Sequence, residues 1–326
     1  MNPLRDGIGH VTKTVAFDVC RSLGVWPMLH RMALGIALAV TVAATPVLAQ
    51  ERQQERQADS VVVQGQRLED AVRDFVAEIG EAPDGENMAR WDRRVCVGVF
   101  NMAPEYAQKL IDRVAVIASA VGLEPGEPGC RVNVLVMADS DGDALAKRLV
   151  DDHLRKLKPA NADGASTLGR EALKRFQSSR APVRWWHVGI TVLSDTGEAV
   201  TRGTSVRVRA GSRLRKNVRQ ELSRVLIILD TSRIGAVSFA SLGDYVAMAT
   251  LAQLDADADT SEFPTVMNLF ANKAGDRTLR LTQWDLDYLR ALYEVPGDAV
   301  SANREQSRIA HQMLDKQSAP RSATAE

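Results

Sequence analysis

The spacing of hydrophobic residues alternates along the chain between the period of an α-helix and that of a β-strand, which predicts an α/β fold. Apolar residues recur every three or four positions in residues 107–121, whereas residues 132–137 form a short β-rich run. The predicted helices cover 68–79, 104–121, 143–157, 168–177, 239–254 and 281–293, and the predicted strands cover 61–63, 95–99, 132–137, 183–193, 204–210 and 224–230. We therefore expect a single α/β (α+β) domain over residues 61–300, built as a mixed sheet with flanking helices, and a polar tail at 301–326.

Local signals mark the ends and faces of some of these elements. Gly122 follows the last turn of a predicted helix, where glycine is a common C-terminal cap. Thr282, with Asp285 three residues later, has the pattern of a capping box. Trp185 and Trp186 are adjacent on a predicted strand, so their side chains point to opposite sides and we expect at most one of them to face the core.

The N-terminal region has the pattern of an export signal. Residues 32–49 form an uncharged apolar run that follows His30 and Arg31 and ends in small residues typical of a cleavage site. We interpret residues 1–31 as an extended or wrongly assigned start and residues 50–60 as a flexible polar leader. The protein is then periplasmic or secreted, with no membrane span after cleavage. The alternative is an anchor through the uncleaved run, whose length is near the lower limit for a span.

The charge balance and the cysteine content narrow the possible functions. The 326 residues include 41 Lys plus Arg and 41 Asp plus Glu, and removal of residues 1–49 leaves 37 basic and 39 acidic residues. Such a chain lacks the positive charge of a dedicated nucleic-acid-binding protein, so no specific nucleic acid is expected as a partner. Export also removes Cys20 and leaves Cys96 and Cys130, an even pair that favours one disulfide.

The common catalytic motifs are missing from the sequence. It contains no H-E-x-x-H zinc motif, no G-x-S-x-G nucleophile motif and no G-x-x-x-x-G-K phosphate-binding loop. The acidic runs at 139–143 and 255–262 lack the glycine and the glutamate of a calcium-binding loop, so we interpret them as a polar helix cap and a solvated loop. We therefore assign no catalytic residue, no metal and no cofactor from these patterns.

The strongest local charge lies in residues 202–224, which hold eight basic residues and one glutamate. Arg207 and Arg209 alternate with valines, and Arg213 and Arg215 follow them. This segment suits contact with an anionic surface. The alternation is also typical of one solvated strand face, and ion pairing with the acidic loops is the competing interpretation.

Two C-terminal segments carry a more specific pattern. Residues 264–268 read PTVMN, and residues 281–293 read LTQWDLDYLRALY. Together they resemble the methionine turn and the following helix of zincin-type metallopeptidases, especially matrixin-like members, and of a family of uncharacterised exported bacterial proteins. The resemblance implies a zincin-like fold in which strand 224–230 is the edge strand, the helix around 243–251 is the active-site helix, and Met267 is a structural residue beneath that helix.

The residues of the catalytic centre depart from the family pattern. The sequence DYVAM at 244–248 stands where H-E-x-x-H is expected, so the resemblance implies an inactive relative, a pseudo-peptidase that keeps a groove for an extended peptide. On this hypothesis Asp244, Tyr245 and the edge near 225–229 contact an envelope protein or peptide. The alternative is an envelope hydrolase with atypical active-site residues, for which Asp244, Tyr245 and His187 are the candidates.

Overall fold

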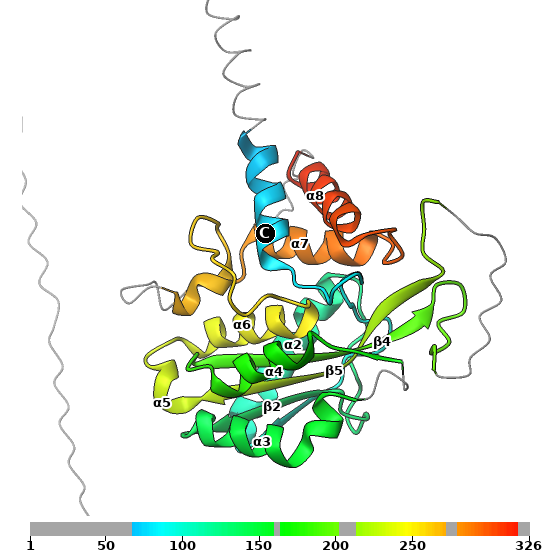
Figure 1. Cartoon of the computed structure of the whole chain (residues 1–326). Helices are drawn as coiled ribbons and strands as arrows, with labels where there is room; N and C mark the ends of the chain where they lie inside the picture. The colour runs from blue at the N-terminus through cyan, green and yellow to red at the C-terminus, as the bar shows by residue number, and fades with distance from the viewer. Residues whose placement is uncertain (1–66, 160–163, 202–212, 272–278, 319–326) are drawn as a thin grey trace, which may run out of the picture. The chain divides into compact units, whose positions relative to one another are not determined.

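A five-stranded mixed sheet forms the centre of the domain in the computed structural model (Figure 1). The strands are β1 (Val97–Phe100), β2 (Val134–Asp139), β3 (Ala165–Ser166), β4 (Val183–Leu193) and β5 (Val218–Asp230). Their order across the sheet is β1-β2-β5-β4-β3. Strands β1, β2 and β5 run parallel, whereas β4 is antiparallel to β5 and β3 is antiparallel to β4. The predicted α/β class with a mixed sheet is confirmed.

The structure describes residues 67–159, 164–201, 213–271 and 279–318. The predicted export signal, the polar leader and the predicted strands at 61–63 and 204–210 lie outside these ranges. Among the helices that are described, none is long and apolar enough to cross a membrane.

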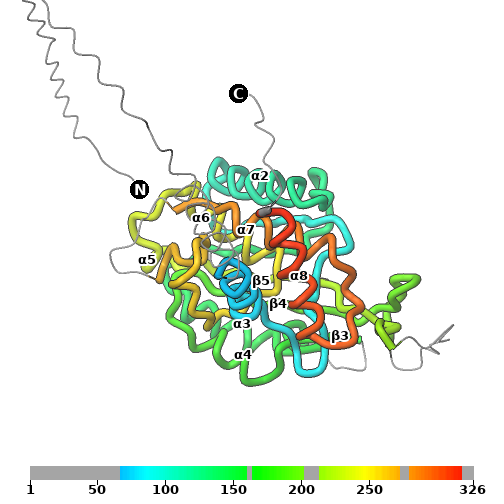
Figure 2. Tube along the Cα trace, turned by 90° about the horizontal axis from the view of Figure 1, so that it is seen from above, coloured from blue at the N-terminus to red at the C-terminus, as the bar shows by residue number. Residues whose placement is uncertain are grey.

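Helices cover both faces of the sheet, which gives the domain three layers. The helices are a first helix at residues 67–79, α2 (Pro104–Ala120), α3 (Gly142–Leu157), α4 (Gly169–Ser178), α5 (Thr231–Ile234), α6 (Phe239–Leu251), the 3-10 helix η2 (Val266–Phe270), α7 (Gln283–Glu294) and α8 (Ala302–Ser318). The first helix, α2, α6, α7 and α8 share one hydrophobic core, whereas α3 and α4 pack in a second core on the opposite face. The first helix lies beside α7 and α8 in both views (Figures 1 and 2).

Two predicted helix ends are found where the local sequence placed them. Gly122 follows α2 with a φ of +85°, a left-handed conformation that glycine adopts without steric cost. At the start of α7, the Thr282 hydroxyl accepts the Asp285 amide (3.2 Å), and the Asp285 carboxylate accepts the Thr282 amide (2.8 Å). This reciprocal pair is the predicted capping box.

The predicted disulfide joins Cys96 to Cys130, whose Cα atoms are 6.1 Å apart. Cys96 immediately precedes β1, and Cys130 lies in the loop before β2, so the bond ties together the starts of two neighbouring parallel strands. Gly126 packs directly against the disulfide, and a larger residue at that position would collide with Sγ of Cys130. The bond therefore fixes the loop that leads from α2 to β2.

Strand β5 lies in the centre of the sheet, which corrects the edge position expected for residues 225–229. It pairs with β2 on one side and with β4 on the other. The side chains from Val225 to Leu229 are at most 6% exposed, since helices cover both faces. A continuous apolar run is typical of such a fully buried strand, but it does not reveal which strands flank it. No peptide can pair with β5 while both of its edges are occupied.

Trp185 and Trp186 are both buried, contrary to the expectation that at most one faces the core. Trp185 packs in the core that contains α6, and its Nε1 donates to the carbonyl of Leu254 (3.1 Å). Trp186 packs against Phe176 of α4, and its Nε1 donates to the carbonyl of Leu157 (2.8 Å). The two side chains do point to opposite sides of the sheet, and a helical layer covers each side.

Helix α8 packs into the domain, so the compact unit continues past residue 300, where the sequence pattern placed its end. Ile309 and Met313 are fully buried in the main core. Glu305 forms a buried ion pair with Arg90, whose guanidinium also donates to two carbonyl oxygens near the end of α7. Few apolar residues of α8 face inward, which is why the segment reads as a polar tail in the sequence.

We expect Glu305→Ala to lower the free energy of unfolding by about 3–5 kcal/mol, because the Arg90 guanidinium stays buried without its carboxylate. Denaturant titration measures this change. Glu294→Ala is the matched control, since the exposed pair of Glu294 with Lys316 contributes less than about 1 kcal/mol. Equal losses in the two variants would contradict the role assigned to the buried pair.

Candidate functional site

Over residues 183–187, the outer edge of β4 has no partner strand in the part of the chain that the structure describes. Strand β4 lies between β5 and β3, but β3 has only two residues, and these pair with Gly189 and Ile190. The chain then leaves the sheet to form α4, and no described strand continues beside the first half of β4. The backbone of this half is therefore an open sheet edge.

Three residues direct both of their backbone hydrogen-bonding groups toward this open edge. The Asp230 amide donates to the Pro182 carbonyl (2.8 Å), so in the antiparallel ladder Pro182 and every second residue after it face β5. The residues between them are Val183, Trp185 and His187. Their N–H and C=O groups consequently point away from β5.

Hydrogen bonds farther along β4 agree with this alternation. Thr191 belongs to the outward-facing series, and its amide donates to the Gly164 carbonyl (2.8 Å) while its own carbonyl accepts the Val200 amide (2.9 Å). Within the described chain, no backbone group is bonded in this way to the outward residues at the start of the strand. Unpaired groups on a strand edge are a template for the addition of another strand.

A narrow cleft, which we call the edge cleft, runs along residues 183–187 and has a volume of about 80 Å³. One wall is α4, which contributes Arg175 and Phe176. The opposite wall consists of residues 254–257, which follow α6, together with Glu81. This volume admits only a few water molecules, so the walls cover the strand edge without pairing with it.

Arg175 links the two walls of the edge cleft. Its Nη2 lies 3.5 Å from Oε1 of Glu81, and its Nε lies 3.0 Å from Oδ2 of Asp257. Burial raises the pKa of Glu81 to about 7, with smaller contributions from Asp255 and Asp257 and an opposing one from Arg175. Glu81 is therefore a carboxyl group at the cleft whose charge changes near neutral pH.

Two residues of the hydrolase alternative, His187 and Tyr245, line the same cleft. The Nε2 of His187 lies 2.8 Å from the Ala249 carbonyl oxygen, which only accepts, so Nε2 carries the proton and Nδ1 is an acceptor. This Nδ1 has no hydrogen-bond partner among the described residues. Burial lowers the pKa of His187 to about 4 and raises the pKa of the Tyr245 hydroxyl. Both groups are poorly matched to acid–base catalysis at neutral pH.

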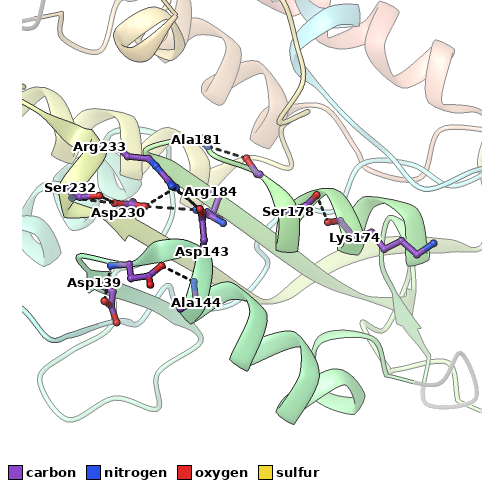
Figure 3. A network of polar contacts seen from close by, with 12 residues as sticks. Asp139, Asp143, Ala144, Lys174, Ser178, Ala181, Arg184, Asp230, Ser232 and Arg233 are labelled. Carbon is purple, nitrogen blue, oxygen red and sulfur yellow. Dashed lines mark hydrogen bonds and ion pairs between the residues drawn. The ribbon is translucent and has the colours of Figure 1, made fainter.

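A network of ion pairs around the buried Arg184 and Asp230 fixes the start of β4 (Figure 3). Nη2 of Arg184 lies 2.7 Å from Oδ1 of Asp143 and 4.0 Å from Oδ2 of Asp230. Arg233 binds the same Asp143 carboxylate through two contacts of 2.7 and 2.6 Å. Hydrogen bonds from Arg233 and Arg184 lower the pKa of Asp143. Because Asp143 lies on α3 and Asp230 ends β5, the network joins the first residues of β4 to both elements.

The two acidic runs have local roles in the structure. Asp141 caps α3 by accepting the Ala144 amide (2.9 Å), which confirms the interpretation of the first run as a helix cap. In the second run, the Asp255 carboxylate accepts the Asp257 amide (2.8 Å). No three His, Cys, Asp or Glu side chains gather in a way that could hold a metal ion in the part of the chain that the structure describes.

Asp244 is bonded within the protein instead of facing a partner. Its fully buried carboxylate accepts hydrogen bonds from Arg113 of α2, from Arg280 (2.7 Å) and from the Leu281 amide (2.9 Å). Burial opposes ionisation of Asp244, but these three bonds outweigh it and lower its pKa. The residue therefore ties α6 to α2 and to the segment before α7, whereas its neighbour Tyr245 lines the edge cleft.

Met267 lies in η2, which packs against α6, and its side chain is partly buried. The loop before it is bonded to α7, because the Thr265 hydroxyl and the Val266 amide both donate to the Asp285 carboxylate (2.5 and 2.9 Å). The same carboxylate caps α7. The two segments that carry the zincin resemblance are thus in direct contact.

Basic residues of the 202–224 segment are bonded to carboxylates elsewhere in the chain. Arg215 pairs with Asp298 (3.3 Å), and Arg219 pairs with Asp92 (2.8 Å). Neither partner belongs to the acidic runs that the sequence suggested. These pairs favour an internal role over contact with an anionic surface. The other candidates of the segment are Arg213, which is exposed, and Arg207 and Arg209, which lie outside the described residues.

Arg175 and Glu81, which face each other across the edge cleft, are not marked by any sequence pattern. In the sequence they look like ordinary charged residues of a helix and a loop, and no motif surrounds them. The one available signal was the predicted strand at 183–193, because a strand beside a short partner keeps part of its edge free. Strand order was needed to use that signal, and local periodicity does not supply it.

Amide hydrogen exchange tests the alternation along β4. We expect the amides of Val183, Trp185 and His187 to exchange at least about tenfold faster than those of Arg184 and Trp186, because only the second group donates to β5. Residue-resolved exchange measured by NMR distinguishes the two groups. Uniform protection from residue 183 to residue 187 would show that the edge is paired.

The buried His187 makes the domain less stable in acid. Its pKa is about 4 in the folded protein against about 6.5 when unfolded, so the unfolded chain gains the proton first and stability falls as the pH drops from 6.5 to 4, by about 3 kcal/mol in all. His187→Gln keeps a donor for the Ala249 carbonyl and should flatten this acid limb. The raised pKa of Glu81 adds stability as the pH falls, but it does so equally in the original chain and in His187→Gln.

Unfolding free energies of the two proteins at several pH values between 4 and 7 measure this difference. Parallel curves for the original chain and His187→Gln would contradict a buried, neutral imidazole.

Geometry, not a sequence motif, defines this site. It consists of an open strand edge, a narrow cleft along that edge and an ion-paired arginine between the walls. No protein-family model, no curated protein and no solved structure matches the chain, so these observations carry the functional argument.

Proposed function

We propose that this protein is an exported, non-catalytic binding module that holds an extended peptide segment of an envelope protein along the open edge of β4. The observation that carries the proposal is the set of outward-facing backbone groups of Val183, Trp185 and His187. An extended peptide that adds to a sheet edge gains main-chain hydrogen bonds, and flanking pockets select its side chains. The edge cleft supplies such flanks on both sides of the strand.

The direction of the bound segment follows from β3. Strand β3 is antiparallel to β4 and occupies the same row of the sheet that the peptide would enter. A peptide that continues this row has its N-terminal end near Gly189 and its C-terminal end near Val183. Antiparallel pairing is also the commoner arrangement in sheets.

The side chains of the hydrolase alternative support binding better than catalysis. Asp244 is held by two arginines, and Tyr245 has a raised pKa. His187 is a weak base whose proton is bonded to a backbone carbonyl. The zincin-like scaffold without its metal ligands, inferred from the sequence resemblance, agrees with a binding role.

The disulfide supports the proposed location of the protein. Bonds of this kind persist in oxidising compartments such as the periplasm and the extracellular space. The Cys96–Cys130 bond lies at the start of two core strands, where its loss would affect the whole sheet. The export signal at 32–49 is the second argument for this location, and it rests on the sequence alone.

A blocking substitution tests the function. The probe is a fluorescently labelled heptapeptide of alternating threonine and valine, acetylated and amidated at its ends, and its binding to the full chain is followed by anisotropy. Ala181 is exposed and lines the edge cleft, so Ala181→Trp should fill the cleft and weaken binding at least about tenfold. Ala103→Trp is the control, because Ala103 is exposed at the start of α2, outside the lining of the edge cleft.

Backbone methylation of the probe gives a second readout of the same claim. N-methyl groups on alternate residues of the peptide remove the donors along one of its edges. One of the two alternate methylation patterns should abolish binding, whereas the other should leave it within about twofold. Equal affinities for both patterns, or unchanged binding to Ala181→Trp, would contradict strand addition at β4.

A further inference from the structure

The charges around the edge cleft define the class of peptide that fits it. Resting on the proposed function, we infer that the cleft selects a peptide with an arginine or lysine side chain, whose cation takes the place of Arg175 beside Glu81 and Asp257. Arg175 is then an internal substitute for the ligand, and it holds the empty cleft closed.

The contacts of Arg175 span the cleft from wall to wall. Arg175 belongs to α4, whereas Glu81 and Asp257 belong to the opposite wall. The two ion-pair distances are 3.5 and 3.0 Å, and the Arg175 side chain is half-exposed at 52%. A half-exposed guanidinium can swing out into water at low cost, so these pairs are a link that a ligand can replace.

A strand cannot enter while this link is in place. Neighbouring strands lie about 4.8 Å apart, and a cavity of about 80 Å³ has no room for a peptide backbone with its side chains. The walls must therefore separate before the peptide pairs with Val183, Trp185 and His187. Separation breaks the contacts of Arg175 with the two carboxylates.

The wall that Arg175 leaves is rich in acceptors. Glu81, Asp255 and Asp257 all line it, and without Arg175 the carboxylates of Glu81 and Asp257 lose their cation from α4. Burial and the neighbouring Asp255 and Asp257 raise the pKa of Glu81, whereas Arg175 favours its charged form. A guanidinium or ammonium group of the peptide would restore the lost charge balance.

His187 provides an independent argument for a donor-rich ligand. It lines the cleft, is 1% exposed, and holds an acceptor nitrogen, Nδ1, without a partner among the described residues. A buried acceptor without a donor costs free energy, which a ligand N–H would recover. The carboxylates and the imidazole nitrogen all accept hydrogen bonds. The charge of Arg184, which also lines the cleft, is balanced by Asp143 and Asp230, so a cationic side chain with several N–H groups fits the remaining lining.

Three forms of one peptide test the selectivity. The scaffold is the acetylated and amidated threonine–valine heptapeptide, with arginine, citrulline or glutamate as its central residue. Citrulline has nearly the shape of arginine without its charge. On the full chain we expect the arginine peptide to bind about fivefold or more tighter than the citrulline peptide, and the glutamate peptide to bind weakest.

Variants of the two partners separate the roles of Arg175 and Glu81. Arg175→Gln should strengthen binding of the arginine peptide by about three- to tenfold, because the internal competitor is gone. Arg170→Gln is the matched control, since Arg170 is an exposed residue of the same helix outside the cleft lining. Glu81→Gln should reduce the preference for arginine over citrulline.

The pH dependence is a further readout. Asp255, Asp257 and Arg175 are the charged groups that act on Glu81. As the pH rises from 6 to 8, Glu81 gains its charge and affinity for the arginine peptide should increase several-fold, whereas the citrulline peptide should show little change. Glu81→Gln should remove most of this increase.

The outcomes distinguish this inference from the function on which it rests. If the arginine and citrulline peptides bind equally and Ala181→Trp still blocks both, the selectivity is wrong. Strand addition at β4 is then still supported. A preference for the glutamate peptide, or weaker arginine-peptide binding to Arg175→Gln, would also overturn it. Failure of all three peptides to bind, to the original chain and to Arg175→Gln, would overturn both.

Discussion

The antiparallel pairing of β4 with β5 is the interaction on which the rest of the structure depends. Strand β5 is bonded to β2 on one edge and to β4 on the other, and its apolar side chains are buried under helices on both faces. This pairing determines which residues of β4 turn inward. It leaves Val183, Trp185 and His187 facing outward, and because β3 is only two residues long they have no strand partner among the described residues. An open edge at this place is therefore a consequence of sheet topology.

Buried polar groups hold the elements around that edge. Arg184 binds Asp143 at the start of β4, and Asp244 ties α6, which leads into one wall of the cleft, to α2. The ion pair of Arg90 with Glu305 holds α8 against the main hydrophobic core. Buried charges of this kind are costly when they lose a partner, so they favour one arrangement of the helices over its alternatives. These buried groups hold the elements that surround the cleft, whereas Arg175, which links its two walls, is half-exposed and pairs with Glu81 and Asp257.

Much of the local structure could be predicted from the sequence, because its causes are local. The helix that ends before Gly122 and the capping box of Thr282 and Asp285 depend on nearby residues. The Cys96–Cys130 bond joins residues 34 positions apart, and it was predictable because export leaves a single pair of cysteines. Strand order does not depend on local sequence, because a run buried on both faces looks the same at the centre of a sheet as beneath a cover at its edge. The edge position that the zincin resemblance implied for β5 is therefore wrong. Most of the site could not be predicted for the same reason. His187 and Tyr245 were candidates from the sequence, but the roles of Arg175 and Glu81 depend on how α4 packs near the loop after α6.

The central claim is that a peptide becomes a new strand beside β4, and the amide protons of that strand test it most directly. The measurement is residue-resolved hydrogen exchange of the full chain at saturating concentrations of the arginine-containing heptapeptide. The account predicts added protection of Trp185, His187 and Val183, with little change at Arg184 and Trp186, whose amides are already bonded to β5. Protection that is confined to α4 or to another surface, or that fails to alternate along β4, would contradict it.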